Sequence, residues 1–250
     1  MITLKSSAEI ELMRRAGKIT AAARALAGEM VRPGVTTQEI DHEVEHFIRK
    51  NGAVPSFLHY AGYPASVCVS VNDEIIHGIP GKRVLKEGDI VSIDVGAYIG
   101  GYHGDCAATF GCGRISPEAQ DLIDVTRQSF FEGLAQAKEG KRLYDISAAI
   151  QSYVESRGYS IVREYVGHGI GTEMHESPEI PNYGHPGRGP RLLRGMTLAV
   201  EPMVNAGSPA IRPMPDGWTV RTRDGKNAAH YENTLLITDG EPEILTAPAI

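Results

Sequence analysis

The sequence predicts an α+β fold in which helices cover antiparallel strands and two similar halves face each other across a pseudo-twofold axis. Two repeated patterns lead to this prediction. An amphipathic helical pattern returns 106 positions later in the chain, and a β-rich run that follows a glycine returns at an offset of 107. Because both correspondences keep their order, they indicate a duplicated unit. No linker-like segment separates the halves, roughly 1–110 and 111–250, so we expect a single domain over 1–250.

The N-terminal half begins with two predicted helices. Residues 6–31 have an amphipathic pattern that starts with a potential capping box from Ser6 to Glu9. The Pro-Gly pair at 33–34 ends it, and a second helix is predicted over 36–51. One face of this second helix is apolar and carries Ile40, Val44, Phe47 and Ile48. Covering a sheet is a sufficient explanation for both helices.

The repeated elements correspond residue by residue. In the helical pattern, Gly34, Ile40, Val44, Phe47, Ile48 and Gly52 match Gly140, Ile146, Ile150, Tyr153, Val154 and Gly158. In the strand pattern, residues 88–94 match residues 195–201. Each of these runs starts at a turn glycine and is expected to end its strand on an acid, Asp94 in one half and Glu201 in the other.

Composition limits the classes of function. Hydrophobic residues make up 42% of the chain and charged residues 22%, as in ordinary soluble enzymes. The net charge of −6 argues against nucleic-acid backbone binding. No apolar run resembles a signal peptide or a membrane span. The 3 cysteines form no CxxC pair, which predicts a reducing compartment, the cytoplasm.

Four acids and one histidine are the candidate metal ligands. A lone carboxylate in a buried strand is costly unless it is protonated, paired or bound to a metal. A single such acid is usually structural, but the two acids of the strand repeat favour a function, and two more acids adjoin the next apolar runs. His168 lies in a glycine-rich segment; alone it would more often be structural. The oxygen-rich set suits manganese, ferrous iron, cobalt or zinc and comprises Asp94, Asp105, His168, Glu201 and Glu232.

A competing motif occurs at residues 42–46, His-Glu-Val-Glu-His, which fits the HExxH pattern of zinc proteases. At about 100° per residue, the apolar residues of this helix cluster on one face and His42 and His46 fall on the opposite face. Zinc ligands must instead face a cleft. We therefore expect this segment to be a solvated helix face.

Several ordered motifs together resemble the type I methionine aminopeptidases, which have the pita-bread fold. The resemblance runs nearly end to end and is strongest in the segments 63–68 (YPASVC), 71–80 (VNDEIIHGIP), 89–94 (DIVSID), 103–105 (HGD), 167–171 (GHGIG) and 201–202 (EP). It implies two divalent metal ions per chain, with Asp105 and Glu232 bridging both, Asp94 on one, and His168 with Glu201 on the other.

The resemblance also implies the roles of other residues. His77 would lie near the scissile nitrogen and His175 would stabilise the oxyanion, while Glu201 would carry a proton from a metal-activated water to the leaving amine. An apolar pocket for the methionine side chain would be lined by Tyr60, Tyr63, Cys68, Met174 and Trp218. Many family members have an aromatic residue at the position of Met174, so this pocket is expected to differ in shape.

The implied activity is removal of the initiator methionine from nascent polypeptides whose second residue is small. The expected protein is a cytoplasmic monomer that binds polypeptide N-termini and neither membranes nor specific nucleic acids; any ribosome contact would be transient.

Related enzymes fit the sequence less well. Prolidases carry an extra N-terminal domain, whereas the 93 residues that precede Asp94 here are already filled by the first half of the repeat. Type II enzymes have an insertion between residues that here are His175 and Glu201, 26 positions apart. A non-catalytic binding protein on this scaffold is the alternative from another class.

Overall fold

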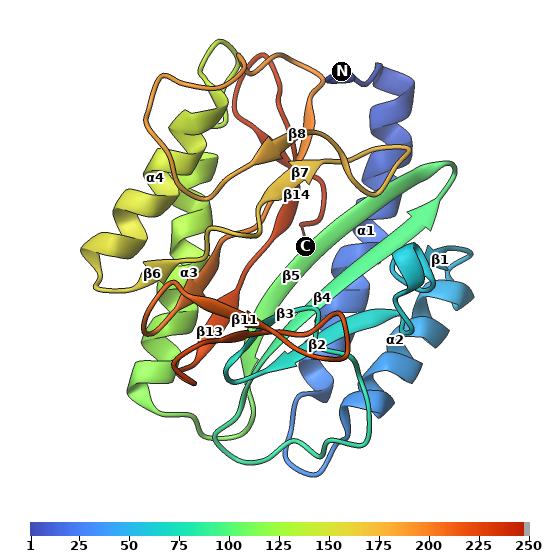
Figure 1. Cartoon of the computed structure of the whole chain (residues 1–250). Coiled ribbons are helices and arrows are strands. Elements are labelled where there is room, and N and C mark those ends of the chain that lie inside the picture. Colours follow the sequence, from blue (N-terminus) through green and yellow to red (C-terminus); the bar gives the residue numbers. More distant parts are fainter. Residues whose placement is uncertain (248–250) are drawn as a thin grey trace.

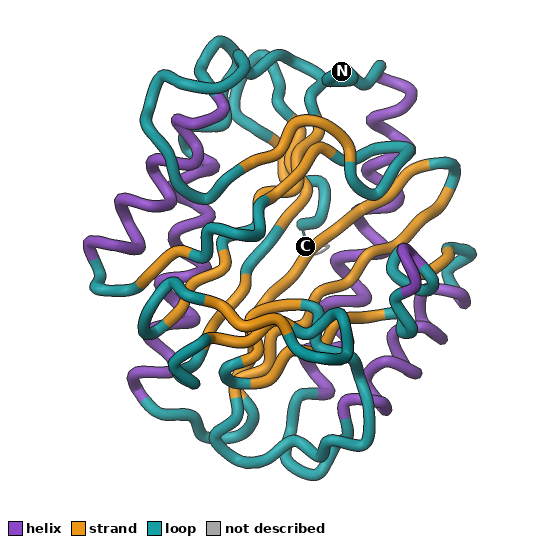
Figure 2. The backbone as a smooth tube through the Cα atoms, in the orientation of Figure 1, coloured by secondary structure: helices purple, strands orange, loops and turns teal. Residues whose placement is uncertain are grey.

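Two pairs of helices flank the strands of the molecule on opposite sides (Figure 1). The computed structural model describes residues 1–247. Its helices are α1 (Ser7–Met30), α2 (Thr37–Lys50), α3 (Pro117–Leu134) and α4 (Leu143–Ser156), with a short 3-10 helix η1 (Tyr60–Gly62). Figure 2 shows the strands gathered between the two helical pairs.

The predicted N-terminal helices are both present. The Ser6 side chain accepts a hydrogen bond from the Glu9 amide and Glu9 reaches back to the Ser6 amide, so the predicted capping box is confirmed. Helix α2 has a capping box of its own, between Thr36 and Glu39. Such boxes satisfy amides that the first helical turn leaves without partners.

Within the described residues the strands form four antiparallel sheets. The strands of the first half are β1 (Val54–Pro55), β2 (Val67–Val71), β3 (Glu74–Ile76), β4 (Ile90–Ile99) and β5 (Tyr102–Gly111). Those of the second half are β6 (Ser160–Ile161), β7 (Gly167–Gly169), β8 (Glu176–Ile180), β9 (Thr197–Val200), β10 (Met203–Asn205), β11 (Ile211–Pro213), β12 (Val220–Thr222), β13 (Ala228–His230), β14 (Asn233–Leu236) and β15 (Glu243–Ile244).

The sheets join segments that are distant in sequence. Strand β4 is paired with β1, β2 and β5, and a second sheet has the order β15-β14-β9-β7-β8. The smaller sheets have the orders β13-β10-β6 and β11-β12-β3. Strand β3 of the first half therefore pairs with β12 of the second, which ties the halves together.

The core supports the predicted duplication. One buried cluster lies under α1 and α2 and includes Ile40, Val44 and Ile48, and another lies under α3 and α4 and includes Ile146 and Ile150. The turn glycines before the repeated strands have nearly the same backbone angle, with φ of 90° at Gly88 and 89° at Gly195. The α+β prediction is confirmed, and the similar packing of the repeated helices supports the predicted duplication.

One detail of the strand prediction is wrong. Asp94 does not end its strand, because β4 continues to Ile99 and pairs with β5 along its whole length. The repeated strand β9 does end at Val200, directly before Glu201. The two acids therefore reach the centre of the molecule differently, one from the middle of a long hairpin and the other from a strand end.

Two further observations concern the described residues as a whole. None of the helices within residues 1–247 combines the length and hydropathy of a membrane span. Cys68, Cys106 and Cys112 are all buried free thiols.

Candidate active site

The first two acids lie on one face of the β4–β5 hairpin. Asp94 is opposite Ala107, and Asp105 is opposite Gly96, two residues further along β4. Residues two apart on a strand share a face, and directly opposed residues do as well. The register therefore places the two carboxylates diagonally on the same side of the sheet.

The other acids come from the second half and meet this hairpin. Glu201 follows β9 and Glu232 precedes β14, and these two strands are paired, with Val200 opposite Asn233. The Glu232 amide donates to the Ala107 carbonyl at 2.9 Å, and the Ala107 amide donates to the Glu232 carbonyl at 3.2 Å. Since Ala107 is the strand partner of Asp94, this backbone pair brings acids from both halves together.

His168 is the middle residue of β7, and the first and last residues of this strand are glycines. A Cβ atom on Gly167 would lie 2.3 Å from the Ala199 carbonyl oxygen, and one on Gly169 would lie 2.3 Å from that of Ser177. Only glycine allows such close approach of the neighbouring strands. Nδ1 of His168 lies 2.9 Å from the Gly169 carbonyl oxygen. A hydrogen bond there leaves Nε2 free as a metal ligand.

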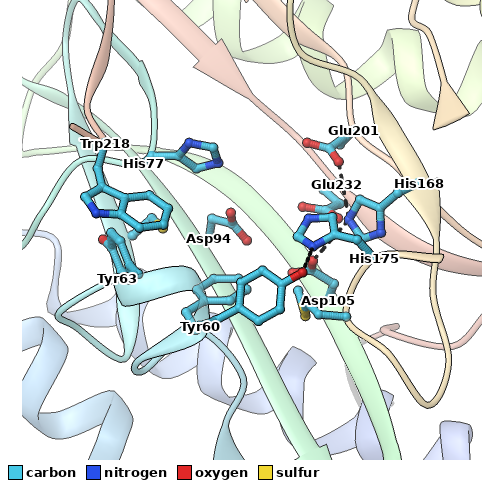
Figure 3. A pocket seen from close by; sticks show the side chains of 13 residues that line it. Tyr60, Tyr63, His77, Asp94, Asp105, His168, His175, Glu201, Trp218 and Glu232 are labelled. Carbon is cyan, nitrogen blue, oxygen red and sulfur yellow. Dashed lines mark hydrogen bonds and ion pairs between the residues drawn. The ribbon is translucent and has the colours of Figure 1, made fainter. Parts of the chain in front are cut away.

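The predicted ligands converge, as Figure 3 shows. Nε2 of His168 lies 3.6 Å from Oδ2 of Asp105 and 3.6 Å from Oε1 of Glu201. Within residues 1–247, two groups have ligand atoms close enough to hold an ion, namely Asp105, His168 and Glu232, and Glu201, His230 and Glu232. Asp94 lies outside both groups but lines the same cavity.

The electrostatics of the cluster fit a cation. Burial, together with the charges of Asp105 and Glu201, raises the pKa of Asp94 and the pKa of Glu232. Burial opposes charge on His168, but the nearby carboxylates of Asp105 and Glu201 outweigh it, so the pKa of His168 is raised. Oδ1 of Asp94, Oδ1 of Asp105 and Oε1 of Glu232 are buried without a hydrogen-bond partner among residues 1–247. Divalent cations would compensate this arrangement.

An apolar pocket opens beside the acids. The predicted pocket residues all line the cavity that contains the five predicted ligands: Tyr60, Tyr63, Cys68, Met174 and Trp218. The rings of Tyr63 and Trp218 meet edge to face at 5.1 Å. Phe57 also lines this cavity and was not predicted from the sequence. It lies in an irregular segment, where no periodic pattern indicates which side chains face inward.

The two predicted substrate-binding histidines lie on different sides of the cavity (Figure 3). His77 packs near Trp218, with ring centroids 6.3 Å apart, and burial lowers its pKa. The ring of His175 lies 4.1 Å from that of His168, and burial followed by the charge of His168 lowers the pKa of His175. Both imidazoles are therefore neutral at neutral pH.

The HExxH segment lies away from this cluster. His42, Glu43 and His46 are exposed on α2, while Val44 points into the core. The expectation of a solvated face is confirmed. His230, by contrast, was missed, although the sequence places it two residues before Glu232. Alternate residues of an extended segment share a side, and this relation was the available signal.

Comparison with known proteins agrees with this geometry. The family model described as metallopeptidase family M24 matches residues 11–239. The chain belongs to metallopeptidase family M24. A methionine aminopeptidase from Clostridium acetobutylicum is 57% identical over 98% of this chain and 99% of its own length. The solved methionine aminopeptidase of Thermotoga maritima is 46% identical, covers 98% of this chain and 99% of its own, and superposes with a TM-score of 0.97.

The M24 fold extends to more distant proteins. A prolidase from Pyrococcus furiosus is 23% identical and superposes with a TM-score of 0.81, with 99% of this chain and 66% of that chain covered. At this identity the likeness concerns the fold alone. The pita-bread prediction and the resemblance to methionine aminopeptidases are both confirmed by these matches.

Proposed function

We propose that the protein is a metal-dependent methionyl aminopeptidase that removes the initiator methionine from new polypeptides whose second residue is small. The observation that carries this proposal is a single cavity that combines a carboxylate and imidazole cluster with an apolar pocket. The substrate itself is inferred from the names of the relatives. We further propose that the whole chain acts as one catalytic domain, since both halves contribute acids.

The cluster would hold two divalent cations, of manganese, cobalt, ferrous iron or zinc. The five side chains proposed to hold them are Asp94, Asp105, His168, Glu201 and Glu232. Their four negative charges match the charge of two such ions, and their oxygen-rich composition suits these metals. When bound, the cations supply Lewis acidity and make a water molecule nucleophilic at neutral pH.

The side chains around the cations perform the remaining work. Glu201 accepts a proton from the water molecule that attacks the peptide carbonyl carbon and delivers this proton to the leaving amine as the carbon–nitrogen bond breaks. His175 is neutral and donates a hydrogen bond to the oxyanion that develops on the carbonyl oxygen. His77, on the opposite side of the cavity, contacts the scissile amide nitrogen.

Specificity for methionine would come from the apolar pocket. Cys68 and Met174 are 5% and 2% exposed, and they pack against Tyr63 and Phe57 in one cluster. Trp218 packs against this cluster, and the hydroxyl of Tyr63 is bonded to backbone carbonyls at 67 and 78, which fixes the ring. A pocket held rigid in this way would accept an unbranched side chain and exclude larger ones. Apolar pockets discriminate single methylene groups by about 1–3 kcal/mol.

The proposed setting is the cytoplasm, where the protein would act as a monomer on the N-termini of nascent chains. Any contact with the ribosome would be transient and would use the folded surface. The net charge of −6 makes a broad basic contact with ribosomal RNA unfavourable.

A peptide panel tests the proposal. The metal-stripped protein is supplied with manganese, cobalt, iron or zinc and assayed on Met-Ala-Ser, Leu-Ala-Ser and Pro-Ala-Ser. Metal-dependent release of methionine alone supports the proposal; it is to be abolished in Glu201→Gln and kept in Glu43→Gln, a matched change on the exposed face of α2. Preferred release of proline or leucine would place the activity elsewhere in family M24. No cleavage with any metal would favour a non-catalytic binding protein.

A further inference from the structure

A second imidazole reaches the acid cluster. His230 ends strand β13 and is 1% exposed. Its Nε2 atom lies 3.6 Å from Oε2 of Glu201 and 3.8 Å from Oε2 of Glu232. Within residues 1–247 this nitrogen has no hydrogen-bond partner. Glu201 therefore has one imidazole near each carboxylate oxygen, with His168 beside Oε1 and His230 beside Oε2.

The backbone holds His230 in place. The His230 amide donates to Oγ1 of Thr109 at 2.9 Å, and that hydroxyl donates to the His230 carbonyl at 2.9 Å. On its other edge β13 pairs with β10, where His230 is opposite Met203. The imidazole is thus fixed against the carboxylates, and an unmade hydrogen bond at so buried a nitrogen would be costly.

His230 approaches the cluster from a different side than the substrate. All five proposed metal ligands line the cavity that contains the apolar pocket, and His230 does not. It lines a separate cavity with Arg24, Thr109 and Tyr231. His230 therefore approaches the Glu201 carboxylate from outside the substrate cavity, where it can hold this carboxylate in place. The proposed ligands instead face the space where substrate would lie.

We infer that His230 is a positioning residue for Glu201. Its Nε2–H group donates to Oε2 of Glu201 and keeps Oε1 directed toward His168, with which Glu201 would hold a cation. Partners of this kind orient metal-binding carboxylates and are typically worth about 10–100-fold in metal affinity or activity. The inference rests on the proposed function of Glu201, but it also predicts an effect on metal binding that can be measured without substrate.

Two variants separate a hydrogen-bond donor from a space-filling side chain. His230→Leu removes the donor while keeping most of the volume, and His230→Gln keeps an N–H donor. Ser147→Ala is the control, because Ser147 is a fully buried hydroxyl on α4 that also lacks a hydrogen-bond partner among residues 1–247. Each full-length variant is checked for folding by thermal unfolding.

The readouts are Mn²⁺ stoichiometry and affinity by titration calorimetry, and kcat and KM for Met-Ala-Ser. The expected result for His230→Leu is unchanged stoichiometry, Mn²⁺ affinity weakened about tenfold and kcat lowered about 10–100-fold, with KM nearly unchanged. His230→Gln should recover most of both losses, and Ser147→Ala should match the wild type.

Each contrary result has its own meaning. Loss of one bound Mn²⁺ in both variants would overturn the inference by making His230 a ligand. Wild-type affinity and kcat in His230→Leu would overturn it as well. If the wild type released no methionine, the proposed function would fail, and Mn²⁺ affinity alone would decide the role of His230. If His230→Leu did not fold, the Gln variant would decide, since loss of Mn²⁺ affinity or kcat there contradicts a donor role.

Discussion

The phenolic oxygen of Tyr60 lies 2.7 Å from Nδ1 of His175. Tyr60 belongs to η1 in the first half, whereas His175 precedes β8 in the second, so this hydrogen bond spans the cavity between the halves. Burial raises the pKa of Tyr60, which keeps its hydroxyl protonated as the donor. With Nδ1 accepting, the proton of the neutral imidazole is on Nε2, where it can donate to an oxyanion.

The first prediction concerns this pair. Tyr60→Phe should lower kcat for Met-Ala-Ser about tenfold and leave KM within about twofold, because oxyanion stabilisation operates in the transition state. Tyr98→Phe, at an exposed tyrosine of the β4 strand, is the matched control and should have no effect. Steady-state kinetics measure both. An unchanged kcat in Tyr60→Phe would show that the hydrogen bond from Tyr60 to His175 does not contribute to catalysis.

The second prediction concerns Met174. Met174→Ala should enlarge the pocket, so the ratio of kcat/KM for Met-Ala-Ser to that for Phe-Ala-Ser should fall at least about tenfold. Met13→Ala removes an equally buried methionine from α1, outside this cavity, and controls for the loss of stability. That control should unfold at a lower temperature but keep its preference. An unchanged ratio in Met174→Ala would mean that Met174 is only packing.

The third prediction separates stability from function at Asp94. In the metal-free protein Asp94→Asn should increase the free energy of unfolding by about 1–3 kcal/mol, because it relieves the burial of a charge next to Asp105 and Glu201. With excess Mn²⁺ the order should reverse, since the wild type gains more from binding. Urea unfolding with and without chelator tests this, with the exposed Asp124→Asn as control. A metal-free variant less stable than the wild type would contradict the account.

The fourth prediction concerns pH and Asp41. Burial raises the pKa of Asp41 above its usual 3.8, although the Ser66 and Val67 amides donate to its carboxylate. The folded protein therefore holds this proton more tightly than the unfolded chain does. The stability from Asp41 is complete below about pH 3.8 and is lost as pH rises through the folded pKa.

Asp41→Asn keeps an oxygen to accept both amides but does not titrate. The free energy of unfolding of the variant minus that of the wild type should therefore be larger at pH 7 than at pH 4. Urea unfolding of both proteins at each pH measures this difference. A difference between the two proteins that is the same at both values would show that the carboxyl pKa is not raised on folding.

Local rules account for much of what could be predicted from the sequence. The capping box at Ser6 and the apolar face at Ile40, Val44 and Ile48 depend on residues within one helix, and the structure confirms them. The cost of a buried carboxylate likewise indicated that Asp94 and Glu201 are functional candidates, and the two acids line one cavity. Predictions failed where contacts between segments far apart in the sequence determine which side chains face the site. His230 is fixed by Thr109, 121 positions away, and Phe57 faces the pocket from an irregular segment.

The measurement that tests the central claim most directly is a stoichiometric metal titration. Metal-stripped protein is titrated anaerobically with Mn²⁺ while bound metal and release of methionine from Met-Ala-Ser are followed on the same samples. The account predicts no activity without metal, and activity that rises with bound Mn²⁺ until about two equivalents saturate the acid cluster. Full activity in the presence of excess chelator, with no metal bound, would contradict it.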